Sequence, residues 1–279
     1  MTTAKPVGFI AGRALLHLLL LLGGLVVCIP LIWMVSASFK TPAQIFTVPI
    51  QWIPDALRFE NYAQAWNTAP FARYFLNSLY IGLTTTALNL FFCSLAGYGF
   101  ARYHFPFKNL LFLFVLATMM IPFHVVLIPL FVLMRDFGWL NSHTALIIPG
   151  MMSAFGIFFM RQFIETLPED LLEAARMDGA SEFRIYWNVV LPLAKSPLAA
   201  LGMFTFLESW NNLLWPLVVI QSEHLRPIAL GLTKFQETHS TNYVLIAAAS
   251  CILIIPMLVI FLAAQRYFVQ GITLSGLKG

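Results

Sequence analysis

Five long stretches of the chain contain no Asp, Glu, Lys or Arg, and they set the pattern of the whole sequence. A helix that crosses a bilayer needs roughly 20 apolar residues, so each stretch can hold one membrane span. One further span, the fifth in chain order, is predicted over Ser196–Gln221, where Glu208 is the one charged residue. The sequence therefore predicts an all-α membrane protein with six transmembrane helices. The uncharged stretches are Ala14–Phe39, Tyr74–Ala101, Asn109–Met134, Phe137–Met160 and Tyr243–Gln265.

The composition supports this class. Of the 279 residues, 59% are hydrophobic and 10% are charged, whereas a soluble domain usually carries about 25% charged residues. The net charge of +4 is spread over the predicted loops and does not indicate nucleic-acid binding. The cysteines, Cys28, Cys93 and Cys251, lie in apolar stretches without CxxC spacing and are interpreted as small hydrophobic residues. The sequence predicts no metal site.

The predicted loops alternate between the two sides of the membrane, so both termini fall on the same side. The first apolar stretch is longer than the roughly 7–15-residue core of a signal peptide and is interpreted as a retained first span. More basic residues lie on the side of the termini, which the positive-inside rule places in the cytoplasm. Lys5, Arg13, Arg102, Lys108, Arg161, Arg176, Arg184, Lys195, Arg266 and Lys278 lie there, and Lys40, Arg58, Arg73, Arg135, Arg226 and Lys234 lie opposite.

The chain is predicted to have three parts. Residues 1–72 form the first transmembrane helix and an external loop, with a short helix near Asn61–Trp66. Residues 73–267 form the transmembrane core, and residues 268–279 form a cytoplasmic tail. In the third span, Pro122 and Pro129 are expected to kink or break the helix. Broken membrane helices are tolerated where they are buried in protein or line a cavity, so these prolines fit a translocation path as well as a kinked structural span.

A polar loop over residues 164–195 interrupts the apolar pattern. The segment Arg161–Lys195 holds ten of the chain's 28 charged residues, and the topology places it in the cytoplasm. Its local signals predict a helix, a tight turn and a second helix outside the bilayer. These signals are a capping box at Thr166 and Glu169, a glycine stop at Gly179, a cap at Ser181 and a proline at Pro192.

The first of these helices carries a small apolar face of Leu171, Leu172 and Ala175. Because Ala174 and Ala175 have small side chains, another backbone could approach closely. This pattern suits docking onto a partner protein, and it suits an ordinary solvated loop equally well.

The stretch EAARMDGASEFRIYWNVVLP, residues 173–192, resembles the EAA motif of the membrane subunits of binding-protein-dependent ABC importers. That motif reads EAA, three residues, G, nine residues and I-x-L-P, and the one departure here is Val189 in place of isoleucine. Asp178 and Ala180 also match the EAAxxDGA form of the carbohydrate branch. The resemblance implies a coupling helix that fits a cleft of an ATP-hydrolysing subunit. The residues it assigns to this contact are Glu173, Ala174, Ala175, Asp178, Gly179 and Pro192.

Two further segments resemble the same family. The C-terminal QRYFVQGITLSGLKG resembles the tail of maltose-type permease subunits, which reaches between the two ATPase subunits. The contact residues implied there are Gly271, Thr273, Gly276 and Lys278. The stretch FLESWNNLLWPLVVI, Phe206–Ile220, resembles a FxxxWNxxxxPL pattern of carbohydrate permeases.

If this last stretch is one continuous helix, Glu208, Asn211, Asn212 and Trp215 share a face. Polar side chains at membrane depth are costly against lipid, so this face is expected to point to the protein interior or a wet cavity. Carboxylate and amide groups suit the hydroxyl groups of a sugar, and tryptophan suits stacking on its ring. The alternative is that these side chains join the helix to a partner subunit. Asn77, Thr84, Thr85 and Asn89 in the second span are further candidates for the substrate pathway.

The resemblance implies a permease subunit that forms half of the pathway of an ATP-driven carbohydrate importer in the bacterial inner membrane. It is not expected to be an enzyme, because the chain lacks the GxxxxGK[ST] phosphate loop. ATP and Mg would be used by partner subunits, and no cofactor is expected on this chain. The partners implied are a second homologous permease, a dimer of ATP-binding subunits and an extracytoplasmic sugar-binding protein, in a membrane and without nucleic acid.

Three alternatives remain at this point. An importer for a polyol phosphate would want Arg or Lys at membrane depth, and the spans contain none. An ion-coupled secondary transporter could use Glu208 as its proton carrier. A scaffold without a transport role would leave the coupling loop and the kinked span unexplained.

Overall fold

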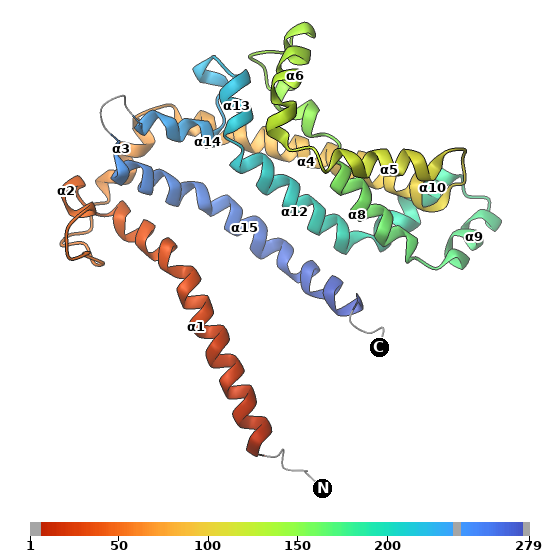
Figure 1. The fold of residues 1–279 in the computed structure, drawn as a ribbon, viewed down its shortest axis with the longest axis horizontal. Helices are drawn as coiled ribbons and strands as arrows, with labels where there is room; N and C mark the ends of the chain where they lie inside the picture. Colours follow the sequence, from red (N-terminus) through yellow and green to blue (C-terminus); the bar gives the residue numbers. More distant parts are fainter. Residues whose placement is uncertain (1–6, 237–240, 276–279) are drawn as a thin grey trace. The chain divides into compact units, whose positions relative to one another are not determined.

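The regular structure of the chain is helical. In the computed structural model, which describes residues 7–236 and 241–275, every regular element is a helix, apart from one isolated antiparallel bridge between Gln236 and Thr241 (Figure 1). Four of the described helical segments are long and apolar enough to cross a membrane. The number rises to six if each of two bent helix pairs is one span, and these pairs are Lys108–Thr118 with Phe123–Asp136 and Glu182–Leu193 with Lys195–Asn211. The all-α membrane fold is therefore confirmed.

The chain divides into two compact units. One consists of residues 1–69 and 234–254, and the other of residues 70–233 and 255–279. These units reflect packing, so the functional boundaries expected after residues 72 and 267 stay predictions.

The first unit contains α1 (Val7–Ser38), α2 (Pro42–Ile45), α3 (Glu60–Asn67) and the first part of α15 (Tyr243–Ser275). The short helix expected near Asn61–Trp66 is confirmed by α3. Asn61 ties α3 to the end of α1, because its side-chain amide donates to the carbonyls of Ser38 and Lys40 at 2.9 and 3.0 Å. Lys40 is fully buried. Its ammonium donates to the Gln51 carbonyl and lies 4.0 Å from the centre of the Trp33 ring.

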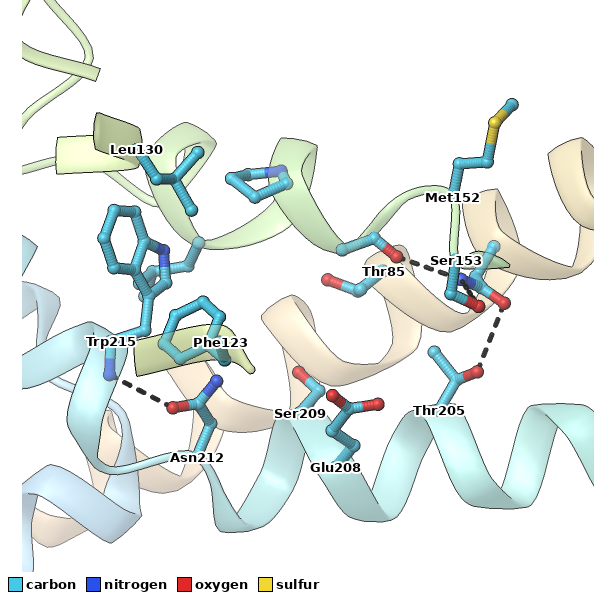
Figure 2. A pocket seen from close by; sticks show the side chains of 14 residues that line it. Thr85, Phe123, Leu130, Met152, Ser153, Thr205, Glu208, Ser209, Asn212 and Trp215 are labelled. Atoms are coloured by element: carbon cyan, nitrogen blue, oxygen red, sulfur yellow. Dashed lines mark hydrogen bonds between the residues drawn. The ribbon is translucent and has the colours of Figure 1, made fainter. Parts of the chain in front are cut away.

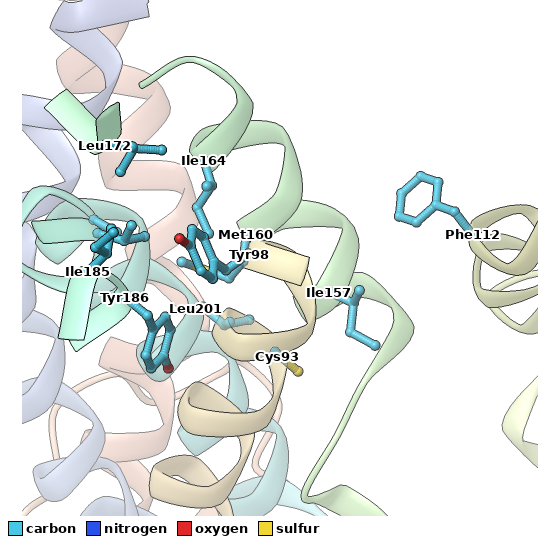
Figure 3. Close-up of a cluster of buried hydrophobic side chains, with 12 residues drawn as sticks. Cys93, Tyr98, Phe112, Ile157, Met160, Ile164, Leu172, Ile185, Tyr186 and Leu201 are labelled. Carbon is cyan, nitrogen blue, oxygen red and sulfur yellow. The ribbon is translucent and has the colours of Figure 1, made fainter. Parts of the chain in front are cut away.

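The second unit is built around α4 (Phe71–Arg102), which packs against α8 (Ala154–Glu165) and α12 (Lys195–Asn211). The contact with α8 is close because Gly97 has no side chain. A Cβ atom there would lie 2.8 Å from the Cβ of Met160 and 2.9 Å from the backbone nitrogen of Arg161. Small residues allow this kind of approach between membrane helices. The core between these helices contains Tyr98, Met160, Ile164 and Leu201 (Figure 3).

Two predicted spans are broken, each four or five residues before a proline. The third consists of α5 (Lys108–Thr118) and α6 (Phe123–Asp136), bent by 100° ahead of α6, where Pro122 is extended. The fifth consists of α12 and α13 (Leu214–Val219), separated at an extended Asn212. A proline ring clashes with the carbonyl four residues earlier and offers no N–H, and for Pro122 and Pro216 that carbonyl belongs to Thr118 and Asn212. The remaining described elements of the chain are α7 (Thr144–Ile147), η1 (Ile148–Gly150), α9 (Glu169–Met177), α10 (Glu182–Ile185), η2 (Tyr186–Val190), α11 (Leu191–Leu193), η3 (Glu223–Leu225), α14 (Ile228–Gly231) and η4 (Leu232–Phe235).

Helix α15 covers the predicted sixth span and continues to Ser275. Residues 268–275 of the predicted tail are therefore helical, which includes Gly271 and Thr273. The other two predicted tail contacts, Gly276 and Lys278, lie outside the described residues.

Candidate functional site

The polar loop has the predicted helix–turn–helix form. Helix α9 ends at Met177 and is closed by two hydrogen bonds of 3.0 Å, from the nitrogen of Gly179 to the oxygen of Arg176 and from the nitrogen of Ala180 to the oxygen of Ala175. This is the Schellman pattern, in which the residue after the cap adopts a left-handed conformation. Gly179 has φ +77°, and nothing lies within 4 Å of the position where a Cβ would be. Glycine is therefore required there by its backbone conformation and not by lack of space.

Of the two helix starts predicted for this loop, one is confirmed and one is wrong. The cap at Ser181 is confirmed, since its hydroxyl accepts from the Arg184 nitrogen at 3.4 Å. The capping box at Thr166 and Glu169 is wrong. Helix α9 begins directly after an extended Pro168, and the Thr166 hydroxyl donates back to the Phe163 carbonyl at 2.7 Å, at the end of α8. The hydroxyl is satisfied by the preceding helix and is not available to the next one.

The outer surface of the loop carries most of the residues of the EAA motif. Glu173, Ala174, Asp178 and Gly179 are exposed, and the neighbouring Met177 is 89% exposed. Pro192, in α11, is also exposed.

The apolar face predicted for docking is wrong in part. Leu172 is fully buried in the core of its own chain, and Ala175 is half-buried against that core. Leu171 remains exposed. The face is mostly used to hold α9 onto its own unit, because an amphipathic helix outside the bilayer buries its apolar stripe wherever a neighbouring core is available.

Glu182 joins the two helices of the loop to α4. One carboxylate oxygen accepts from Arg176 Nε at 2.8 Å, and the other accepts from the hydroxyls of Tyr98 at 2.8 Å and Tyr103 at 2.9 Å. The hydrogen bond from Arg176 is the main reason that the pKa of Glu182 falls to about 2, with smaller contributions from the two tyrosines and an opposing effect of burial. No local signal in the sequence identifies these tyrosine partners of Glu182.

A polar cavity of about 190 Å³ lies beside the middle of α4 (Figure 2). Its lining residues come from α4, α6, α12, α13 and the segments that join them. Among them, Glu208 is the one ionisable side chain, and its carboxyl group points into the cavity (Figure 2). They are Thr85, Asn89, Phe123, Leu130, Leu146, Pro149, Gly150, Met152, Ser153, Thr205, Glu208, Ser209, Asn212 and Trp215.

The polar groups of the cavity differ in whether they already have hydrogen-bond partners. The amide of Asn89 donates to the Gly150 carbonyl at 3.1 Å and accepts from the Thr205 hydroxyl at 3.2 Å, so it already joins three segments. The hydroxyl of Thr85 is buried and has no hydrogen-bond partner among the described residues. An unpaired buried hydroxyl costs free energy, and at a cavity wall a bound solute can supply the missing partner.

The break at Asn212 corrects the predicted helix face. Glu208, Asn212 and Trp215 line the cavity, but Asn211 does not, and its amide donates to the Leu207 carbonyl at 3.0 Å. The Asn212 side chain accepts from the Trp215 nitrogen at 3.2 Å, which caps α13.

Two other candidates have structural partners. The buried indole N–H of Trp215 donates to the Ala145 carbonyl at 2.8 Å. Asn77 lies away from the cavity and donates to the carbonyls of His224 and Arg226 at 2.9 and 3.0 Å. Of the predicted pathway residues, the cavity therefore gathers Thr85, Asn89, Glu208, Asn212 and Trp215, and it adds Thr205, Ser209 and Ser153.

Comparison with known proteins identifies the family to which this chain belongs. Residues 91–274, more than half of the chain, match the family described as "Binding-protein-dependent transport system inner membrane component". The chain belongs to this family. It is therefore a membrane component of a transport system and not a member of a known enzyme family. The polar loop and the cavity-lining residues from Phe123 to Trp215 lie within the matched range.

Similar proteins match this chain over most of its length. The arabinooligosaccharides transport system permease protein of Bacillus subtilis (strain 168) is 37% identical over 270 residues, covering 96% of each chain. The lactose transport system permease protein of Rhizobium radiobacter is 36% identical over 242 residues, covering 87% of this chain and 88% of the relative. A chain of a bacterial ABC transporter involved in the import of the polysaccharide alginate has the same fold, with a TM-score of 0.82 at 24% identity over 96% of this chain and all of that one.

Proposed function

We propose that this chain is one of two permease subunits of an ATP-driven importer for a sugar or oligosaccharide. The observation that carries the proposal is that one unit of the chain holds both an exposed EAA loop and a cavity lined by hydroxyl, amide and carboxyl groups. Relatives named for arabinooligosaccharide and lactose transport support the substrate class. The partners are a second permease, two ATP-binding subunits and an external sugar-binding protein. Both termini lie in the cytoplasm.

The exposed surface of the loop suits a protein cleft. Besides Glu173, Ala174 and Gly179, it presents two large apolar side chains, Met177 and Phe183, which are 89% and 59% exposed. In a segment outside the spans, such side chains gain from burial against a partner at about 25 cal/mol per Å² of apolar surface. ATP binding would draw the two ATP-binding subunits together and move this loop, with ATP and Mg held by those subunits. We expect the C-terminal residues Gly271, Thr273, Gly276 and Lys278 to contact the same subunits.

The cavity favours an uncharged solute. Thr85, Ser209 and Asn212 can hydrogen-bond to hydroxyl groups, and each such bond contributes about 0.5–1.5 kcal/mol net. Among the lining residues there is no Lys, Arg or His, so a phosphate group would meet the Glu208 carboxyl without a cation to balance it. A polyol phosphate is therefore the poorer fit.

Substituting one glycine tests the coupling. The change is Gly179→Val in the complete importer, reconstituted with its partner subunits. Valine strains the left-handed conformation by about 1–2 kcal/mol and adds bulk to the docking surface. We expect uptake of solute, and ATP hydrolysis stimulated by the loaded binding protein, to fall at least tenfold.

The matched control is Gly138→Val. Gly138 has φ +70° and equally open surroundings, but it follows α6, away from the loop. It should retain most of the activity. Equal activity of both variants and the wild type would refute coupling through this loop, and equal loss in both would point to backbone strain alone.

A further inference from the structure

Three side chains at four-residue spacing form a polar ladder on α4. Ser94, Tyr98 and Arg102 share one face of the helix because residues four apart lie one turn above another. Each of them contacts a different part of the polar loop over residues 164–195, which is called the coupling loop below. These contacts lead from the loop to the second predicted span.

The first two rungs hold the second half of the loop. The hydroxyls of Ser94 and Tyr186 are 2.8 Å apart, and both residues are buried. The hydroxyl of Tyr98 donates to Glu182 at 2.8 Å, and Glu182 in turn accepts from Arg176 on α9. One carboxylate therefore ties both loop helices to α4.

The third rung holds the beginning of the loop. One guanidinium nitrogen of Arg102 donates to the carbonyls of Ile164, at 2.6 Å, and Leu167, where α8 ends. Another lies 3.8 Å from a carboxylate oxygen of Glu169, the first residue of α9. The Arg102 side chain is only 9% exposed. Hydrogen bonds of this kind are stronger in a low-dielectric interior and costly to leave broken.

Apolar side chains of the loop also pack against α4. Leu172 of α9 and Ile185 of α10 are fully buried in the core that also contains Tyr98 and Tyr186 (Figure 3). Polar and apolar contacts therefore fix the loop to the end of α4 along its whole length, so displacing the loop alone would break both.

The other part of α4 forms a wall of the cavity through Thr85 and Asn89. Tyr98 lies 13 residues beyond Thr85, which is about 20 Å along a helix at about 1.5 Å per residue. We propose that Ser94, Tyr98 and Arg102 are positioning residues that make α4 the element through which movement of the coupling loop reaches the cavity. This rests on the proposed function, since it assigns a route to the same coupling.

Distances within the unit test whether the loop and α4 move together. One spin label would replace Arg184, which is exposed on α10, and the other would replace Leu83, which is 57% exposed on α4. The native cysteines would first be changed to alanine. In the complete importer, the distance between the labels should be the same with and without ATP. Glu182→Gln should broaden the distribution of this distance. A distance that changes with ATP in an importer that transports solute would overturn the inference.

Coupling efficiency gives a second readout. Tyr98→Phe and Glu182→Gln should each lower the solute transported per ATP at least about fivefold, the lower end of typical coupling between sites. Binding of the ATPase subunits should be unchanged, and the double variant should lose no more than the stronger single one. The control is Tyr80→Phe, on the same helix but more than half exposed and distant from the loop.

The outcomes separate the two proposals. If the wild-type complex transports no solute, the proposed function fails. If it transports solute and the variants keep the wild-type ratio, only the route through α4 fails. If Tyr98→Phe does not assemble, the label distance in the wild-type complex still decides.

Discussion

The unpaired hydroxyl of Thr85 gives the sharpest test of the cavity, because removing it has opposite effects on the free and the loaded protein. Thr85→Val keeps the shape of the side chain and removes a buried hydroxyl that has no partner among the described residues. Leaving such a group unpaired costs about 1–3 kcal/mol, so the thermal midpoint of the solute-free complex should stay the same or rise.

Solute binding should weaken in the same variant. If the solute supplies the missing hydrogen bond, its loss removes about 0.5–1.5 kcal/mol, which is about a two- to twelvefold increase in the apparent Kd. The assay is thermal unfolding in detergent over a solute titration, together with the concentration dependence of uptake in proteoliposomes.

Thr86→Val is the matched control for this prediction. The Thr86 hydroxyl is also buried without a partner among the described residues, and it lies on the same helix but does not line the cavity. It should leave solute affinity unchanged. Wild-type affinity in Thr85→Val, or an equal loss in both variants, would refute the view that this cavity holds the solute.

Three further predictions concern charge, pH and packing. Glu208→Gln should lower solute affinity severalfold and leave uptake dependent on ATP. If uptake is instead driven by a proton gradient and the variant abolishes it, a secondary transporter is favoured. The pKa of Glu182 is lower in the folded protein, at about 2, than its ordinary value of 4.5, so its contribution to stability is fully present above about pH 4.5 and is lost as the pH falls toward 2; a spin label at residue 184 should therefore keep constant mobility from pH 5 to 9, and a transition in that range would contradict the assignment. Gly97→Ala should cost about 1–3 kcal/mol by pushing α8 away from α4 and lower the thermal midpoint by several degrees, whereas Gly99→Ala, with open space around it, should not.

The sequence was sufficient to predict local structure where one residue type suits a particular backbone conformation or helix end. Gly179 supplies a positive φ that other residues adopt only with strain, and Ser181 supplies an oxygen to a free helix N–H, so the turn between α9 and α10 could be placed from sequence. Thr166 carried a similar signal and was misassigned, because its hydroxyl had a nearer acceptor in the helix before it.

The break at Asn212 was within reach of sequence reasoning. Pro216 prevents a helical hydrogen bond to the Asn212 carbonyl, and the Asn212 side chain caps the next helix. Proline alone does not decide the matter, since Pro30 lies inside an unbroken α1 and Pro256 inside α15. The combination of a proline with a capping side chain four residues earlier is the stronger signal.

The contacts between segments could not be derived in this way. The partners of Glu182 on α4 are about 80 residues away in sequence, and nothing in the local pattern pairs them. Burial of Leu172 likewise depends on a neighbouring core that the apolar spacing of α9 does not identify.

By the proposed function, this chain moves a sugar only when a separate ATPase acts on its exposed loop. The most direct measurement is uptake of a neutral oligosaccharide into proteoliposomes, comparing the complete importer with the same permease pair lacking the ATP-binding subunits, each with ATP or with a proton gradient alone. We expect uptake only in the complete importer with ATP, and we expect Gly179→Val to abolish it. Uptake by the permease chains alone, driven by the proton gradient, would contradict it.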